Sequence, residues 1–314
     1  MLRRSLFKAV AALVGSAGIV SAHRLSEMGR PRGKQTGRKL AAHNFVEAAD
    51  GTNLFFRDSG SGKPMLFAAP WAMHSAWWQY QVYGLTSQGI RCITYDRRGH
   101  GRSGESNRSG DLDLLADDMS EVIEQLDLRE VTLIGQSLGC GEVVRYLTRH
   151  GSARISRAVL VSTITPFGLK TEDNPDGTDR ATLEKIRETL RKDHAHPVAA
   201  FAPSFFGVPR NTVSQEIMDW WVRMMVDGFS LKTMNDLQKV FTETDFRPEL
   251  RKISVPTLLI HGDNDTSTPI ETTARKTLPL IQGCQLKVYE GASHGLPVTH
   301  ADQLNADLLA FAKT

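Results

Sequence analysis

A serine enclosed by two glycines is the strongest chemical signal in this sequence. Ser137 is the central residue of G-Q-S-L-G, which runs from Gly135 to Gly139. An apolar stretch at 131–134 precedes it with the pattern of a buried strand, and apolar residues at helical spacing follow over 143–147. A side chain on such a strand-to-helix corner projects from the end of a sheet, and small neighbours let the corner turn sharply. The pattern therefore predicts a nucleophilic serine, which is the chemistry of acyl transfer.

A nucleophilic serine needs a histidine base to accept its proton. The chain has ten histidines, and on this type of sheet the base follows the serine and the acid in chain order. His294 and His300 are the two that follow an acid-bearing turn. His294 lies in G-A-S-H-G directly after the strand pattern QLKVYE, in a loop where a base is expected, whereas His300 begins the terminal helix. We therefore predict His294 as the general base.

Two aspartates compete for the role of the acid that orients this histidine. Asp263 and Asp265 both lie in H-G-D-N-D, which follows the apolar strand pattern VPTLLI. Either carboxylate can reach the end of a sheet from there, and the residues alone do not separate them. We expect the other aspartate to accept hydrogen bonds from the amides of its own turn, a common use of aspartate. His261, which precedes both, is interpreted as structural.

The elements that must position these residues alternate along most of the chain. A hairpin is expected over 44–60, with its turn at Asp50-Gly51. Further strand patterns lie at 65–70, 89–96, 131–135, 154–163, 255–263 and 285–291. Helical patterns begin at about Ser75 and recur over 114–127, 143–147, 270–278 and 301–313. The alternation predicts an α/β fold with a mainly parallel, eight-stranded sheet covered by helices on both faces.

Residues 165 to about 246 break this alternation. They contain four helical patterns and no clear strand, which predicts a helical cap over the functional end of the sheet. The cap is crowded with large apolar side chains: Phe201, Phe205, Phe206, Trp220, Trp221, Met224, Met225 and Phe229. Helical spacing favours the core of the cap itself for most of them, and an apolar acyl or aryl pocket is the functional alternative. The substrate-binding candidates are Phe201, Phe205, Trp220, Trp221 and His74, and His74 could instead cap a helix.

The N-terminal residues carry the pattern of an export signal. Residues 1–22 combine a short basic region, a moderately apolar stretch and a small-residue ending, which predicts a cleaved secretory signal. The pair Arg3-Arg4 resembles a twin-arginine signal, which implies a periplasmic or secreted protein exported in the folded state. The apolar stretch is short and rich in Gly and Ala for a span of ~20 residues, so we expect no stable membrane insertion. Residues 23–42 are interpreted as a basic flexible linker and 43–314 as the hydrolytic domain.

Composition excludes several classes of protein. Of the 314 residues 40% are hydrophobic and 23% charged, as in ordinary globular proteins. The net charge of the whole chain is +3, and its basic excess lies before residue 43. The remainder is mildly acidic, so a nucleic-acid partner is not expected. Cys92, Cys140 and Cys284 form no disulfide framework and no zinc-ligand spacing, although one pairing stays open in an exported protein. G-H-G-R-S-G at 99–104 lacks the following helix of a dinucleotide site, and we expect neither a metal nor an organic cofactor.

Together these motifs resemble the α/β-hydrolase superfamily. G-Q-S-L-G, H-G-D-N-D and G-A-S-H-G carry the resemblance with Y-D-R-R-G-H-G-R-S at 95–103, and it covers about residues 43–313. Within the superfamily the chain resembles the cofactor-free haloperoxidases, aryl esterases and perhydrolases, which N-P-D-G at 174–177 also fits. In this pattern the acid is the second aspartate, so the resemblance implies Asp265 rather than Asp263.

The resemblance also places the oxyanion hole on the backbone N–H groups of Trp71 and Leu138. The family has His-Gly-aromatic after the third strand, whereas this chain has Ala69-Pro70-Trp71. Because the donors are backbone groups, the loss of the His and Gly need not abolish the hole, although Pro70 has no N–H and stiffens the loop. One oxyanion donor is worth roughly 3 kcal/mol of transition-state stabilisation. We therefore expect the change to alter loop geometry and substrate preference more than the chemistry.

The implied function is hydrolysis of a small carboxylic ester through an acyl-enzyme on Ser137, with His294 as base and Asp265 fixing its tautomer. Water, or hydrogen peroxide by analogy with the group, would release the acid. Lactone hydrolysis and C–C bond cleavage use the same triad and stay open. A catalytically idle binding protein of the same fold is the alternative from a different class. The sequence determines neither the physiological substrate nor the oligomeric state.

Overall fold

The structure, a computed structural model, describes residues 44–105 and 111–313, which belong to one compact unit. The signal peptide and the linker expected at 1–22 and 23–42 lie outside the described residues and stay predictions. Within the part of the chain that is described, no helix is long and apolar enough to cross a membrane.

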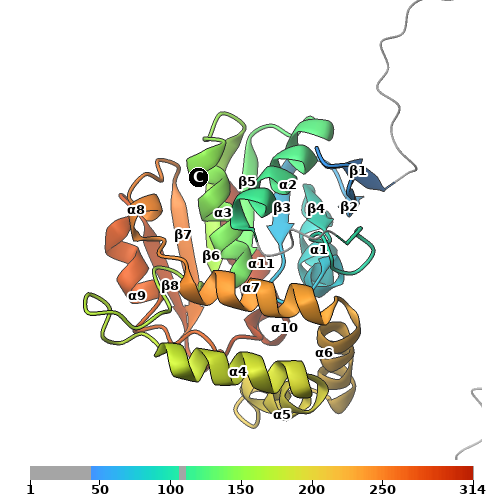
Figure 1. Ribbon diagram of the computed structural model, residues 1–314. Coiled ribbons are helices and arrows are strands. Elements are labelled where there is room, and N and C mark those ends of the chain that lie inside the picture. Colours follow the sequence, from blue (N-terminus) through green and yellow to red (C-terminus); the bar gives the residue numbers. More distant parts are fainter. Residues whose placement is uncertain (1–43, 106–110, 314) are drawn as a thin grey trace, which may run out of the picture. The chain divides into compact units, whose positions relative to one another are not determined.

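Eight strands form one sheet in the order β1-β2-β4-β3-β5-β6-β7-β8 (Figure 1). The strands are β1 (Phe45–Glu47), β2 (Asn53–Ser59), β3 (Lys63–Ala68), β4 (Ile90–Tyr95), β5 (Val131–Gln136), β6 (Ile155–Val161), β7 (Thr257–Gly262) and β8 (Gln285–Tyr289). The β1–β2 hairpin is antiparallel and β2 is antiparallel to β4, whereas every later neighbour pair is parallel. The predicted α/β fold class is confirmed.

Helices cover both faces of the sheet. They are η1 (Ser75–Trp78), α1 (Gln79–Thr86), α2 (Leu112–Gln125), α3 (Leu138–Arg149), α8 (Arg247–Leu250), α9 (Ala274–Thr277), η2 (Leu278–Leu280), α10 (Leu296–Thr299) and α11 (Ala301–Lys313). Successive strand residues point to opposite faces, so Leu133 packs into the core beneath α2 and α3, and Ile134 into the core beneath α1 and α11. Both faces of the central strands are therefore buried, which explains their continuous apolar runs.

The helix expected at 270–278 is shorter than the sequence pattern suggests. Regular α-helix covers Ala274–Thr277 and passes into the 3-10 turn Leu278–Leu280. The hydroxyls of Thr272 and Thr273 donate to the Pro269 carbonyl at 3.1 and 2.8 Å. These side-chain bonds give the backbone an alternative to regular helix at its start.

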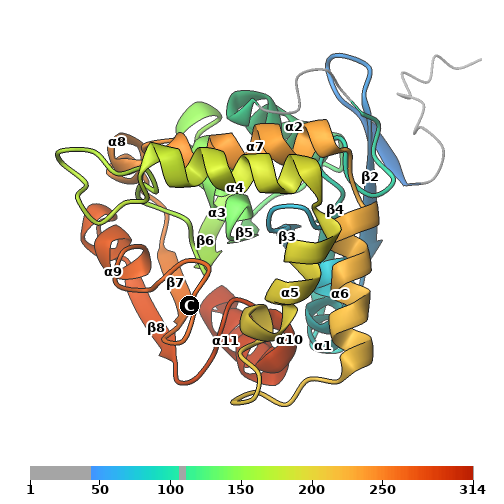
Figure 2. The ribbon, with the colours of Figure 1, turned by 60° about the horizontal axis from the view of Figure 1, so that its bottom comes forward.

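Between β6 and β7 the chain forms four longer helices. They are α4 (Arg180–Lys192), α5 (Ala195–Phe206), α6 (Gln215–Asp227) and α7 (Leu231–Glu243). The side chains of Asp179, Ser214 and Ser230 cap α4, α6 and α7 by accepting from a backbone N–H of the first turn. The four helices lie at the end of the sheet toward which the arrow of β3 points (Figure 1), and α4 runs beside α7 (Figure 2).

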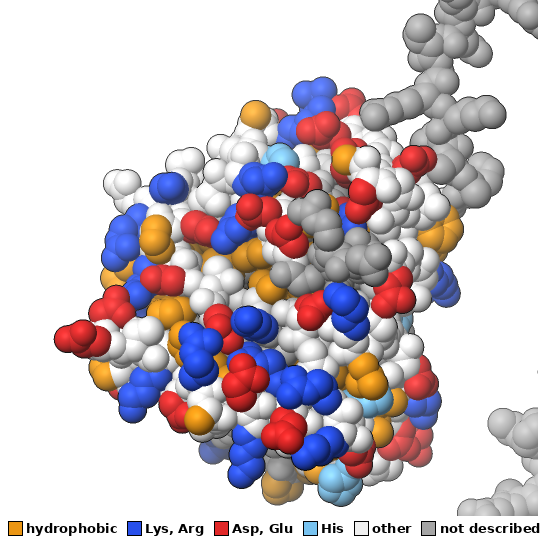
Figure 3. Space-filling view, viewed as in Figure 1, with side chains coloured by type: hydrophobic (Ala, Val, Ile, Leu, Met, Phe, Trp, Pro, Cys, Tyr) orange, Lys and Arg blue, Asp and Glu red, His pale blue; other side chains and the backbone are white. Residues whose placement is uncertain are grey.

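Ion pairs join α4 to α7. Glu243 of α7 accepts from Arg180 at 2.9 Å and from Arg187 at 3.0 Å. Figure 3 shows Lys and Arg side chains interspersed with Asp and Glu side chains over these two helices. This face of the cap therefore presents a mixed charge rather than one sign.

Candidate active site

Ser137 occupies a strained corner between β5 and α3. Its backbone has φ 54° and ψ −117°, a conformation that residues with a side chain rarely adopt. The two flanking glycines permit the close packing around it. A Cβ at Gly135 would lie 2.4 Å from the carbonyl oxygen of Gly139, and a Cβ at Gly139 would lie 2.3 Å from that of Ala68. The G-x-S-x-G spacing thus lets α3 begin directly against β5 and the end of β3.

Replacing Gly139 by alanine is expected to lower the free energy of unfolding by about 1–3 kcal/mol, because the added methyl must displace backbone. Alanine has the higher helix propensity, so an unconstrained helix position would change in the opposite direction. Urea unfolding measures the change. Gly104→Ala is the control, since its methyl would approach no atom closer than the Thr52 side chain at 3.3 Å. A Gly139→Ala variant as stable as its parent would show that α3 can move away from β3 without cost.

His294 and Asp265 meet in loops that follow neighbouring parallel strands. His294 follows β8 and Asp265 follows β7, and the distance from His294 Nδ1 to Asp265 Oδ2 is 2.7 Å. Both residues are buried. The other carboxylate oxygen of Asp265 accepts the backbone N–H groups of Ser267 at 2.9 Å and Thr268 at 3.0 Å. These bonds hold the carboxylate toward the imidazole.

The charge state of Asp265 suits this contact. Burial alone would raise the pKa of its carboxyl, but the adjacent His294 ring and its hydrogen bond outweigh burial and hold the pKa below its usual value. The ionised carboxylate therefore accepts a hydrogen bond from His294 Nδ1–H, so the free lone pair of the neutral ring is on Nε2. His261 lies behind the pair, with Nε2 donating to the Thr268 carbonyl at 2.7 Å, and burial lowers its pKa. His261 thus holds the Thr268 backbone, which is consistent with the structural role expected from the sequence.

Asp263 has a different set of contacts from Asp265. Its Oδ1 accepts the backbone N–H of Gly291 at 2.6 Å, and its own N–H donates to the Tyr289 carbonyl at 3.2 Å. Asp263 thereby ties the end of β7 to the loop that leads to His294. The structure thus places Asp265, and not Asp263, against the imidazole.

Gln136 links the serine corner to the histidine loop. Its Nε2 donates to the backbone carbonyl of His294 at 2.7 Å, and its Oε1 accepts from Trp77 Nε1 at 2.6 Å. Gln136 is fully buried and directly precedes Ser137. Sequence reasoning missed this residue, although a lone amide at the end of an apolar strand was a usable signal.

Trp71 and Leu138 lie on the loop after β3 and at the first position of α3. The first amides of a helix have no acceptor within the helix. Among the described residues, the backbone N–H of neither Trp71 nor Leu138 has a hydrogen-bond partner. The Trp71 indole is anchored to the cap, with Nε1 donating to the Met234 carbonyl of α7 at 3.0 Å. Both amides are therefore available as donors, that of Leu138 directly after Ser137 and that of Trp71 on the loop after β3.

The aromatic candidates of the cap occupy different positions. Phe205 packs edge-on against the His294 ring at 5.4 Å between centroids, with Trp221 behind it at 4.4 Å. Trp220 stacks on Trp77 at 6.0 Å. Phe201 is 37% exposed on the outer part of α5. Phe205 is therefore the candidate in contact with the His294 ring, and the buried Trp221 belongs to the core of the cap.

His74 caps the 3-10 turn η1, accepting from the Ala76 N–H at 3.4 Å. Burial lowers its pKa, and the nearby Arg57 and Arg102 add to this effect against the opposing charge of Asp96. His74 also lines a cavity of about 380 Å³ together with Arg57, Arg102 and Arg223. None of Ser137, Asp265 and His294 lines this cavity.

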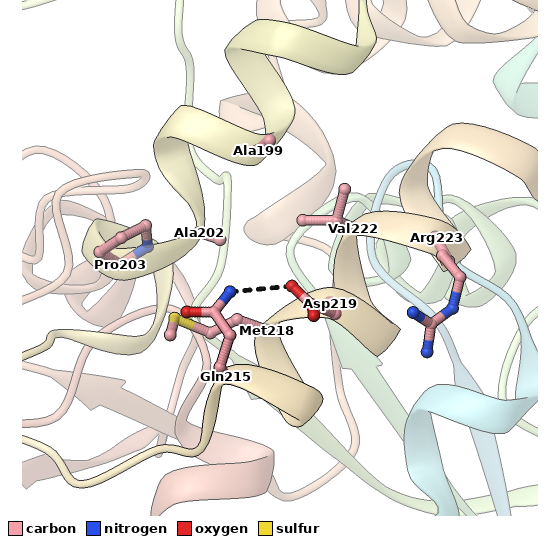
Figure 4. A pocket seen from close by; sticks show the side chains of 8 residues that line it. All are labelled: Ala199, Ala202, Pro203, Gln215, Met218, Asp219, Val222 and Arg223. Carbon is pink, nitrogen blue, oxygen red and sulfur yellow. Dashed lines mark hydrogen bonds between the residues drawn. The ribbon is translucent and has the colours of Figure 1, made fainter.

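A second cavity, of about 280 Å³, lies between α5 and α6 (Figure 4). Gln215 and Asp219 of α6 line it and are joined by a hydrogen bond of 2.8 Å, and Ala202 borders it from α5. The three residues of the predicted triad do not line it either. Both cavities are therefore separate from the serine corner.

The three cysteines carry free thiols: Cys92 and Cys140 are buried, and Cys284 is partly buried. Within residues 44–105 and 111–313, no cluster of three or more His, Cys, Asp or Glu side chains could hold a metal ion.

Comparison with known proteins shows the family of this chain. The family model described as the alpha/beta hydrolase fold matches residues 63–301. A non-heme haloperoxidase of Rhodococcus erythropolis is 40% identical over 273 residues, which cover 86% of this chain and 99% of that protein. A bifunctional esterase/perhydrolase of Acinetobacter calcoaceticus is 34% identical over 276 residues, with coverage of 86% and 99%.

A solved structure extends the likeness to three dimensions. The crystal structure of a bromoperoxidase from Bacillus anthracis superposes with a TM-score of 0.82 at 35% identity, covering 86% of this chain and 99% of the other. Sequence and fold agree over nearly the same part of the chain. The protein therefore belongs to the alpha/beta hydrolase fold family, with non-heme haloperoxidases and an esterase/perhydrolase among its homologues.

Proposed function

We propose that this chain hydrolyses carboxylic esters of small molecules through an acyl-enzyme formed on Ser137. The observation that carries the proposal is the 2.7 Å pairing of His294 Nδ1 with Asp265 Oδ2, on loops at the sheet end where Ser137 forms its corner. With Nδ1–H bound to the carboxylate, Nε2 can accept the serine proton. The homologue named as an esterase/perhydrolase supports the same chemistry.

The proposed reaction has two transfers. The Ser137 hydroxyl gives its proton to His294 Nε2 while Oγ forms a bond to the ester carbon, and the carbonyl π electrons move to its oxygen. The backbone N–H groups of Trp71 and Leu138 donate to that oxyanion. The intermediate collapses by breaking the bond to the alcohol oxygen, which takes the proton from Nε2. Water then repeats the sequence on the acyl-enzyme and releases the carboxylic acid.

Peracid formation is a second candidate activity of the same site. Hydrogen peroxide can replace water in the second transfer, because its oxygen attacks the acyl-enzyme in the same way and loses a proton to His294. The product is then a peracid rather than an acid. The esterase/perhydrolase homologue is the observation that favours this activity.

A fluorophosphonate probe and an ester series test the proposal. The probe phosphonylates an activated serine, so we expect a stoichiometric adduct on Ser137, located by peptide mass spectrometry. We also expect turnover of p-nitrophenyl acetate, butyrate and octanoate. A preference among the three measures the acyl space beneath the cap, where Phe205 borders His294.

The two readouts separate an enzyme from a binding protein of the same fold. A binding protein without an activated nucleophile would carry no adduct and turn over no ester, which would overturn the proposal. Labelling of Ser137 without turnover of any simple ester would move the substrate class to lactones or C–C bonds, and would reject the ester assignment.

A further inference from the structure

Arg97 and Arg98 are adjacent buried arginines that bind different parts of the protein. The Arg97 guanidinium donates from Nη2 to the Ala69 carbonyl at 2.7 Å and from Nη1 to the Pro70 carbonyl at 3.4 Å. Its Nε donates to the Glu142 carboxylate. Arg98 instead pairs with Asp118 of α2, through bonds of 2.6 and 2.5 Å. Only the first of these two arginines contacts the loop that carries Trp71.

Glu142 connects this contact to the nucleophile helix. It is fully buried in α3, one turn after Leu138, and therefore on the same side of the helix. One of its carboxylate oxygens accepts from Arg97, and the other accepts the Tyr95 hydroxyl at 2.7 Å. Burial, and then the Glu142 charge, raise the pKa of Tyr95, so its hydroxyl stays a donor. Arg97 thus bridges the loop after β3 and the first turns of α3.

The Pro70 contact determines the direction of a neighbouring amide. The peptide bond between Pro70 and Trp71 is trans, because the cis bonds of the described chain precede Pro166 and Pro209. In a planar trans peptide the carbonyl and the next N–H point in opposite directions. A guanidinium that holds the Pro70 carbonyl on one side therefore turns the Trp71 N–H to the other side. The Ala69 bond fixes the preceding peptide in the same way.

We propose that Arg97, held by Glu142, is a positioning residue that fixes the two amides of the oxyanion hole relative to each other. The inference rests on the proposed ester hydrolysis and assigns a further part of that site. One amide belongs to the Ala69-Pro70-Trp71 loop and the other to α3, and Arg97 contacts both segments. In that loop this chain lacks the His-Gly of the family that it resembles. The bonds from Arg97 fix the backbone of the loop instead.

A double substitution can separate a positioning role of Arg97 from a purely structural role. A buried ion pair is expensive to desolvate, and removing one partner leaves an uncompensated buried charge. Arg97→Met alone therefore lowers stability whatever its catalytic role. Arg97→Met combined with Glu142→Gln removes both charges and leaves an amide oxygen for the Tyr95 hydroxyl. The double variant relieves the buried charge but does not restore the donors to the Ala69 and Pro70 carbonyls.

The experiment measures kcat and KM for p-nitrophenyl butyrate in these variants, with thermal unfolding as a check of folding. We expect kcat to fall about 10²- to 10³-fold in both the single and the double variant, the effect of losing one oxyanion donor. KM should stay within about threefold, because ground-state binding does not use the oxyanion geometry. Arg97→Lys keeps the positive charge but loses the planar set of guanidinium donors. We expect it to retain part of the kcat that Arg97→Met loses.

The matched control is the neighbouring pair, Arg98→Met with Asp118→Asn. It removes a buried ion pair that does not contact the loop after β3. Asp50, which also accepts from Arg98, keeps its charge in the variant but is partly exposed to water. We therefore expect kcat to stay within about threefold below the unfolding temperature. Recovery of kcat in the Arg97/Glu142 double variant, or an equal loss in the control pair, would overturn the positioning role. A wild-type protein that turns over no ester would instead overturn the proposed function, and the inference with it.

Discussion

Replacing Ser137 by alanine is expected to lower kcat for p-nitrophenyl butyrate by roughly 10⁴- to 10⁶-fold. Without Oγ there is no nucleophile, so His294 has no proton to accept and no acyl-enzyme forms. The amides of Trp71 and Leu138 remain, so a weak residual rate above the uncatalysed reaction should persist. The same substitution should abolish labelling by a fluorophosphonate probe.

Ser162 provides a matched control for this substitution. It directly follows β6, is fully buried and also has a positive φ, of 43°. Its hydroxyl has no hydrogen-bond partner among the described residues. Ser162→Ala should therefore leave kcat within about threefold, because no step uses this hydroxyl. Unchanged turnover in Ser137→Ala would mean that another residue carries the reaction.

Replacing Asp265 by asparagine is expected to lower kcat about 10⁴-fold while the protein remains folded. The amide has nearly the shape of the carboxylate, so the bonds from Ser267 and Thr268 can still form. An amide is, however, a poor substitute for the charge that holds the proton on His294 Nδ1. An amide N–H facing the ring favours the opposite tautomer, in which Nε2 carries the proton and cannot accept one from serine.

Asp263→Asn is the informative comparison, because the two aspartates are equivalent in the sequence motif. Asp263 accepts from the Gly291 amide and does not touch the imidazole. An amide oxygen can still accept that bond, so kcat should change less than about tenfold, with a modest loss of thermal stability. Steady-state kinetics of both variants decide the assignment. A large loss in Asp263→Asn together with a small one in Asp265→Asn would reverse it.

Which of the two aspartates contacts His294 could not be predicted from the residues around them. Both follow the same strand, two residues apart, and only the family resemblance favoured Asp265. In the structure the turn after β7 directs Asp265 toward the loop after β8 and Asp263 toward the Gly291 amide. Because that choice depends on how two turns fold against each other, no local pattern expresses it.

Local sequence patterns also did not predict the contacts of Gln136 and Arg97, although the position of each residue in the sequence is unusual. Gln136 is an amide at the end of an apolar strand, and Arg97 is a charge directly after another such strand. Their partners are the His294 carbonyl, 158 positions away in the chain, and Glu142, 45 positions away. A buried polar side chain must find a partner, but the sequence does not say which one.

The fold class and the Ser137 corner could both be predicted from the amino-acid sequence, and His294 stays the predicted base. These follow from short-range physics: apolar periodicity separates strands from helices, and a Gly-x-Ser-x-Gly corner is a local steric requirement. Three contacts came from the folded chain alone: Asp265 faces His294, Phe205 is the cap ring against it, and Arg97 ties the loop of Trp71 to α3. Those contacts join segments brought together by strand order and helix packing, which are properties of the whole chain.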